Sequence, residues 1–272
     1  MKKGIILTTA IVILATCGIT KAQGDLGVTL DATWVSKYIW RGFDRLDDKA
    51  AFQPSMMVDL FNTGFHVGVW GSWAGASQNN GAVSTVGATE LNYILSYKNR
   101  INEGEALQVD YAVNYIYYDF VKRASKQFDA HEVSLSVALP QVTGIGLVPR
   151  YSVAYLWNAR SGGPARDLTG WIHEFGLDYN LVVCDLIPNN PEQVFTFSWD
   201  ITYNDGAGQM YPAPGRGNVE HDWSHMTWGV TTDIAAPWGG SFRPGLYWQN
   251  SWEDSVNTQD ELWLALSYSL SF

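Results

Sequence analysis

Hydrophobic and polar residues alternate with a period of two in segment after segment of this chain, and this pattern limits the possible folds more than any other feature. The last segment, ELWLALSYSLSF, shows it most clearly, because every even-numbered position from Leu262 to Phe272 is aliphatic or aromatic. Successive side chains of a β-strand point to opposite faces, so the pattern predicts a strand with two different environments. A strand of about ten residues is also long enough to cross a bilayer when it is tilted.

Twelve segments carry this alternation. The candidate strands are residues 28–38, 52–61, 65–74, 89–98, 106–118, 129–139, 147–157, 171–181, 193–204, 223–234, 242–252 and 261–272. Connections after the odd-numbered strands are long, as in NARSGGPARDLTG, and those after the even-numbered strands are mostly short, as in NTG. Long loops at one end and short turns at the other are typical of bacterial outer-membrane barrels. The apolar connection 182–192 is long for a turn and leaves ten or fourteen strands as alternatives.

The aromatic residues favour a membrane barrel over a soluble β-protein. The chain has 13 Trp, 14 Tyr and 11 Phe. On the apolar face they tend toward the strand ends, with aliphatic residues between them, as in the girdles at the two lipid–water interfaces. We therefore predict an all-β fold, a transmembrane antiparallel up-and-down β-barrel of about 12 strands. His173 interrupts the apolar face, and we expect it near an interface.

The N-terminus has the features of a secretory signal peptide. Lys2 and Lys3 precede an apolar run that is too short to span a membrane. We expect cleavage after Ala22, which leaves residues 23–272 as a single barrel domain and makes Cys184 the only cysteine. A lipoprotein cleavage site at Cys17 is the alternative.

The net charge of the chain excludes one class of partner. The whole sequence has a formal charge of −10, and the expected signal peptide removes three lysines, which leaves 14 basic and 27 acidic residues. Nucleic acid is an implausible partner for such an acidic chain.

The polar face of the predicted strands lines the lumen of the predicted barrel. The candidate lumen-lining residues are Asp31, Arg41, Asp59, Glu90, Asp110, Glu132, Arg150, Glu174, Asp178, Asp200 and Arg243. Acidic residues outnumber basic ones on this face, so we expect a negative potential that favours cations or neutral polar solutes. In the alternative arrangement these charges pair across a narrow lumen and close it. Arg41, just past the first strand, is expected either to fold inward as a constriction or to form a salt bridge at the rim.

The C-terminus predicts how the barrel is assembled. In a closed barrel the last strand pairs with the first, so the chain has no free tail. Phe272, with Leu270 and Tyr268 on the same face, resembles the signal that the barrel-assembly machinery reads in outer-membrane proteins. The expected partners are therefore this machinery, outer-membrane lipid and lipopolysaccharide; the number of barrels in an assembly stays open.

The first third of the chain resembles a known family. In WVSKYIWRGFDRLDDKAAFQPSMMVDLFNTGFHVGVWGSW the shared pattern is S-x-Y-x-x-R-G, a proline in the second strand, and G-x-x-x-G-x-W-x-S. The matching positions are Ser36, Tyr38, Arg41, Gly42, Pro54, Gly64, Gly68, Trp70 and Ser72. This pattern is similar to that of the TorF-like porin family of bacterial outer-membrane β-barrels. The resemblance implies a channel, although SMMVDL departs from the family in the second strand.

Signals for catalysis or metal binding are weak. Asp44, Asp47 and Asp48 could form a weak divalent-cation site, but they lack EF-hand spacing and fit a solvated loop better. His221 is expected in a loop, and strand alternation places Ser224 and His225 on opposite faces, so no Ser–His pair is expected. We therefore expect no enzyme, no cofactor and no metal. The sequence predicts an outer-membrane porin for small polar solutes or cations, with an occluded structural or binding barrel as the alternative.

Overall fold

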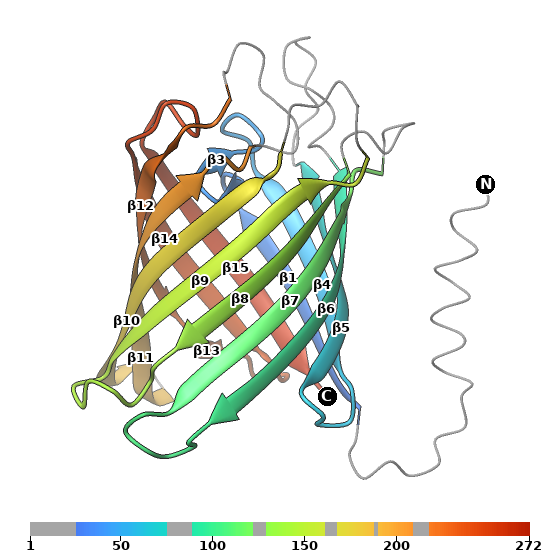
Figure 1. Cartoon of the computed structure of the whole chain (residues 1–272). Helices are drawn as coiled ribbons and strands as arrows, with labels where there is room; N and C mark the ends of the chain where they lie inside the picture. Colours follow the sequence, from blue (N-terminus) through green and yellow to red (C-terminus); the bar gives the residue numbers. More distant parts are fainter. Residues whose placement is uncertain (1–25, 75–88, 122–128, 161–167, 188–189, 209–217) are drawn as a thin grey trace, which may run out of the picture.

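The computed structural model describes residues 26–74, 89–121, 129–160, 168–187, 190–208 and 218–272. The predicted signal peptide and its cleavage site lie outside these residues. Twelve long strands form a closed antiparallel barrel (Figure 1). They are β1 (Gly27–Val35), β4 (Ala51–Asp59), β5 (Phe65–Ala74), β6 (Thr89–Ile101), β7 (Val109–Asp119), β8 (Ala130–Ala138), β9 (Leu147–Asn158), β10 (Gly170–Ile187), β11 (Asn190–Asp205), β12 (His221–Thr232), β14 (Ser241–Ser251) and β15 (Glu261–Ser271). The short strands are β2 (Ile39–Trp40), β3 (Phe43–Asp44) and β13 (Ile234–Ala235).

The first and last strands close the barrel. β1 pairs with β15 from Thr29↔Ser271 to Val35↔Ala265. The main chains of Val28 and Phe272 exchange two hydrogen bonds, of 2.8 and 3.0 Å. The C-terminal residue is thus part of the seam, and the pairing leaves no open edge between these two strands. The predicted all-β barrel of about twelve strands is confirmed.

The expected long connection at 182–192 is wrong, because both strands continue through it. β10 and β11 remain paired at Val182↔Val194 and Cys184↔Glu192, and an irregularity follows before Ile187↔Asn190. The alternation of apolar residues extends the ladder, so the strand count stays at twelve. His221 is also misplaced by the prediction, since it is the first residue of β12 and pairs with Asp205.

The two ends of the barrel differ. We call the end that carries the connections after β1, β5, β7, β9, β11 and β14 the long-loop end, and the opposite end the short-turn end. Figure 1 shows the long-loop end uppermost, with β3 inside its rim and the C-terminus at the lower end. Among the residues that the structure describes, no helix is long and apolar enough to cross a membrane.

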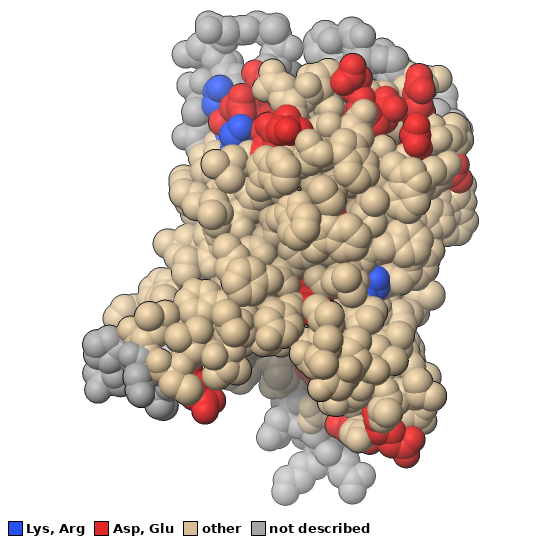
Figure 2. All heavy atoms as spheres, turned by 90° about the vertical axis from the view of Figure 1, so that its left-hand side faces the viewer, with Lys and Arg blue, Asp and Glu red and all other residues tan. Residues whose placement is uncertain are grey.

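The outer face of the barrel is apolar. Large side chains such as Trp34, Phe197, Trp228 and Leu264 are exposed there. Figure 2 shows acidic side chains gathered at the upper end and a few at the lower end, with a mostly uncharged surface between them. An uncharged band between two charged ends fits a barrel surrounded by lipid.

His173 on this outer face is explained by its neighbours. Its Nδ1 lies 2.8 Å from the hydroxyl of Tyr151, and its ring stacks with that of Trp171. His131 is placed in the same way, 2.7 Å from the hydroxyl of Tyr115. Each imidazole therefore stacks with neighbouring aromatic side chains and has a tyrosine hydroxyl as its polar partner within the apolar surface.

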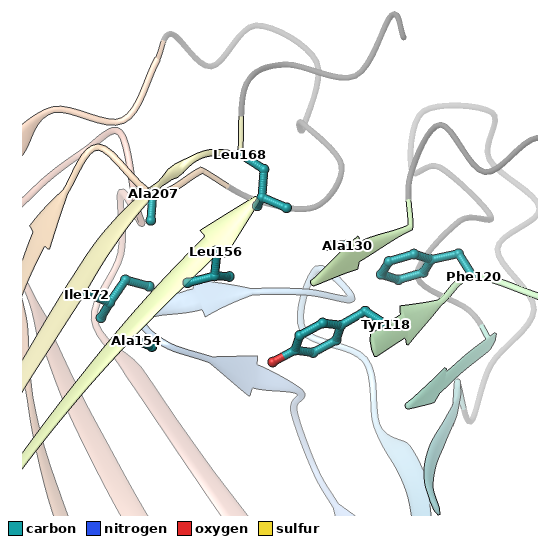
Figure 3. Packing of buried hydrophobic residues seen from close by; sticks show 8 residues of the cluster. All are labelled: Tyr118, Phe120, Ala130, Ala154, Leu156, Leu168, Ile172 and Ala207. Atoms are coloured by element: carbon teal, nitrogen blue, oxygen red, sulfur yellow. The ribbon is translucent and has the colours of Figure 1, made fainter. Parts of the chain in front are cut away.

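The interior of the barrel is filled at the long-loop end. One buried hydrophobic cluster consists of Tyr118, Phe120, Ala130, Ala154, Leu156, Leu168, Ile172 and Ala207, with Trp40 and Ile116 packed against it (Figure 3). A second cluster contains Val35, Tyr38, Leu46 and Ala51. Both clusters include or contact residues 36–50, the segment that joins β1 to β4, so this segment decides how the lumen ends.

Candidate functional site: the lumen and its inward hairpin

Residues 36–50 fold back as a small hairpin, which we call the inward hairpin. β2 and β3 pair at Ile39↔Asp44 and Trp40↔Phe43. The two turn residues, Arg41 and Gly42, have φ values of 49° and 89°. Positive φ at both central residues defines the tight turn that suits the twist of paired strands. Phe43 and Leu46 are fully buried, so the hairpin lies inside the barrel and not on its rim.

Gly42 has a second reason to be glycine. A Cβ atom at this position would lie 2.4 Å from Nδ1 of His225 and 2.9 Å from Val256. The amide of Gln249 also donates a 2.9 Å hydrogen bond to the Gly42 carbonyl. His225 and Gln249 belong to β12 and β14, so the tip of the hairpin is held against this side of the wall.

Charged side chains fasten the hairpin to the other side of the wall. Arg41 donates a 2.6 Å hydrogen bond to Glu132 on β8. Arg45 lies 3.4 Å from Glu90 on β6, and both side chains are almost completely buried. The hydroxyl of Tyr118 on β7 donates to the second oxygen of Glu132 at 2.7 Å. The hairpin therefore spans the lumen between strands β6–β8 and strands β12 and β14.

Aromatic rings surround the buried guanidinium group of Arg45. The group lies 4.9 Å from the ring centre of Trp40, 5.7 Å from that of Phe120 and 5.8 Å from that of Tyr38. A guanidinium group is attracted to aromatic faces, and more strongly when it is shielded from water. The ion pair and the rings together compensate the burial of the charge.

Electrostatics favour the charged forms of the cations on the hairpin. Burial opposes the charge of Arg41 most strongly, but Glu132, Tyr118 and Glu174 together outweigh it, and the pKa of Arg41 lies above its ordinary value. Burial likewise opposes the charge of Lys37, and its pairing with Asp48 and Glu261 still raises its pKa. Burial raises the pKa of Asp44, although main-chain N–H groups of Asp48 and Leu46 partly offset this.

Asp44, Asp48 and Glu261 come together in a group whose oxygen atoms lie within 4.8 Å of one another. Lys37 is part of the same group, since its ammonium pairs with Asp48 and lies 2.8 Å from Glu261. Part of the negative charge is thus already neutralised by a lysine. The group works as a latch between the base of the hairpin and β15.

A second group of charges lies in the open part of the lumen. Arg150 on β9 is 2.8 Å from Asp178 and 2.7 Å from Asp200, and 3.8 Å from Glu174. Gly176 on β10 leaves room for this contact, because a Cβ atom there would lie 2.4 Å from Asp200 and 2.7 Å from Arg150. One guanidinium group thus faces three carboxylates. We call these four side chains the carboxylate cluster.

The remaining predicted lumen residues pair with near neighbours. Asp110 accepts from Arg100 at 2.6 Å, and Arg243 donates to Asp233 at 2.7 Å. Asp59 lies 3.5 Å from His66, and Asp31 accepts a 3.3 Å hydrogen bond from Ser55. The structure thus divides the predicted set between the inward hairpin (Arg41, Glu90, Glu132), the carboxylate cluster and separate pairs.

Sequence reasoning missed Arg45 and Gln249, which are central to the hairpin. Arg45 stands in FDRLDD, where charged neighbours are typical of an exposed loop, yet it is 2% exposed. The only signal in the sequence was Trp40 and Phe43 flanking Arg41 and Gly42, a pattern that fits a short hairpin. Trp40, Trp70 and Tyr118 all pack around this hairpin.

Ser224 and His225 were expected on opposite faces, and this is wrong. β12 carries one extra residue opposite Thr202 and Tyr203, and this bulge brings Ser224 Oγ within 2.9 Å of His225 Nδ1. Ser224 is fully buried and donates its proton to the Thr202 carbonyl at 3.2 Å. Its hydroxyl thus lies within hydrogen-bonding distance of both His225 and the main chain.

The comparisons with known proteins agree with this architecture. The KdgM porin, in a complex described with disordered oligogalacturonate, matches with a TM-score of 0.51 at 12% identity over 90% of this chain and 99% of KdgM. The NanC porin matches with a TM-score of 0.50 at 8% identity over 89% of this chain and 98% of NanC. At such identities the likeness shows the fold, and the chain is a twelve-stranded β-barrel of the type found in outer-membrane porins.

A family comparison defines the chain further. The family described as "Bacterial protein of unknown function (Gcw_chp)" matches residues 20–159, more than half of the 272 residues. The chain therefore belongs to the Gcw_chp family. A search of curated proteins finds no match.

Proposed function

We propose that the protein is an outer-membrane channel for small solutes whose long-loop end is constricted by the inward hairpin. The observation that carries the proposal is a closed barrel with an apolar outer face and a hairpin held across its lumen by ion pairs to both sides of the wall. Its likeness to porin folds and its resemblance to TorF-like porins support the same role. Export through a signal peptide at residues 1–22, assembly through the C-terminal Phe272 and contact with lipopolysaccharide are parts of this proposal.

The selectivity of the channel follows from the charges that remain accessible. Glu90 and Glu132 are neutralised and buried by the hairpin. In the carboxylate cluster, by contrast, the three acidic side chains are 20–30% exposed around one arginine. A lumen with excess accessible negative charge attracts cations and repels anions. The proposed channel therefore prefers cations and neutral polar solutes.

A planar-bilayer recording tests this function. Residues 23–272 refolded into lipid should give discrete conductance steps, and under a salt gradient the reversal potential should have the sign of a cation-selective pore. The double substitution Asp178→Asn and Asp200→Asn should move that potential toward zero. The matched control is Asp59→Asn, whose carboxylate lies beside His66 outside the cluster.

An occluded barrel is the second candidate, and the almost complete burial of Phe43, Arg45 and Leu46 in the lumen favours it. In that case inserted protein gives no current, and the long loops carry the function. Conductance that appears only after the hairpin is removed would assign the chain to this second class or to a gated channel.

A further inference from the structure

Two aromatic rings lie in the lumen directly below the inward hairpin. Tyr247 on β14 and Trp263 on β15 are register partners, and their rings are parallel within 12° with centres 5.2 Å apart. They share a strand face with Gln249 and Glu261, which contact the hairpin and its latch. Each ring is two residues closer to the short-turn end than these contacts. On β14 and β15 the pair is therefore the first wall surface below the constriction.

Glycines on the neighbouring wall make room for Tyr247. A Cβ atom at Gly229 would lie 2.9 Å from the Tyr247 ring, and one at Gly245 would lie 2.7 Å from it. Glycine inside a strand weakens the strand and marks a place where another group approaches closely. Two such glycines let the ring lie against the wall, so that it takes little width from the lumen.

The surroundings of the two rings are polar. Ser198 lies beside Gly229, and Arg243 precedes Tyr247 on the same face of β14. Gln249 and Glu261 lie two residues above the rings on the same faces, and beyond Ala265 the hydroxyls of Thr33 and Ser267 lie 2.8 Å apart. A stacked aromatic surface thus lies among hydrogen-bonding side chains. A large aromatic residue is unusual on a wall that contacts only water.

A sugar ring has the chemistry that fits this surface. One face of a pyranose presents C–H groups that pack on an aromatic ring, and its edge presents hydroxyls for serine, threonine and charged side chains. The accessible acid excess disfavours an anionic sugar. We propose that Tyr247 and Trp263 form a binding site for neutral saccharides in the lumen. The site names the class of solute that the proposed channel would carry, and its biological role rests on that channel function.

Binding in detergent tests the site independently of conduction. Refolded residues 23–272 are titrated with maltose by calorimetry, with sorbitol as an acyclic polyol and glucuronate as an acidic sugar. Maltose should bind more tightly than either. Trp263→Ala and Tyr247→Ala should each weaken maltose binding roughly tenfold, as expected for the loss of one aromatic packing surface. Trp263→Phe, which keeps a ring, should weaken it less.

Trp248→Ala is the matched control, because Trp248 neighbours Tyr247 in sequence but is exposed on the outer face. It should leave maltose binding unchanged. Absent maltose binding, equal binding of sorbitol, or binding that survives both alanine substitutions would overturn the saccharide site. The channel proposal fails separately, when the inserted unmodified protein carries no current.

Discussion

The two ends of the lumen hold their charges in different ways. At the long-loop end the side chains of Arg45 and Glu90 are each 1% exposed, and that of Glu132, also 1% exposed, holds Arg41 from a different part of the chain. Toward the short-turn end the pairs join neighbouring strands or turns, and Arg243 and Asp233 are 58% and 51% exposed. The buried pairs at the long-loop end fix the inward hairpin inside the barrel wall. The exposed pairs toward the short-turn end leave charges in contact with solvent, where they act on passing ions.

The largest effect is expected from Glu132→Gln. The change leaves the partly buried guanidinium of Arg41 without a carboxylate. Removing one partner costs about 3–5 kcal/mol for a fully buried pair, and less for this one, in which the Arg41 side chain is 19% exposed. The hairpin should leave the lumen, so conductance should rise and trypsin should cleave at Arg41 or Arg45. The control is Asp110→Asn, which breaks an exposed pair with Arg100. Resistance to trypsin equal to that of the unmodified protein would show that the pair does not hold the hairpin.

Gly42→Ala should have the next largest effect. A non-glycine residue at φ 89° is strained, at a cost of about 1–2 kcal/mol. The new methyl group would also meet His225. The matched control is Gly104→Ala, because Gly104 has φ 77° and no atom within 4 Å of the added Cβ. Conductance should rise for Gly42→Ala and not for Gly104→Ala; equal behaviour would mean that the contact with His225 is unimportant.

Arg150→Gln should change the ion selectivity of the lumen with little effect on the inward hairpin. It removes the one guanidinium group that faces Glu174, Asp178 and Asp200. The reversal potential under a salt gradient should move further toward that of an ideal cation pore. Arg243→Gln, which frees one carboxylate, should produce a smaller shift in the same direction. A shift toward anions after Arg150→Gln would contradict the proposed selectivity.

The smallest effect is expected from Asp233→Asn at the short-turn end. Exposed ion pairs contribute about 0–1 kcal/mol, because water screens both charges. The free energy of unfolding in detergent, from urea titration, should therefore fall far less than it does for Glu132→Gln. Similar losses in the two variants would remove the distinction between the two ends of the lumen.

The barrel could be predicted from sequence because a repeating pattern encodes it. The alternation shows which residues of each strand share a face, and the prediction failed at strand ends: at 182–192, at residues 36–38 and at His221. The inward hairpin could not be predicted in this way. Arg45 and Glu90 are 45 residues apart, and no local pattern indicates that Phe43, Arg45 and Leu46 of FDRLDD are buried. The bulge that unites Ser224 and His225 was missed for a similar reason, because one extra residue shifts the faces without changing the composition.

A conductance comparison with a hairpin-free barrel tests directly whether the inward hairpin constricts the lumen. Val35 pairs directly with Ala51, so residues 36–50 can be replaced by the two-residue turn Asn-Gly. If this variant keeps the circular dichroism of a folded barrel, its steady single-channel conductance should be several-fold higher than that of the unmodified protein. Equal conductance in the two barrels would contradict the claim that the inward hairpin constricts the lumen.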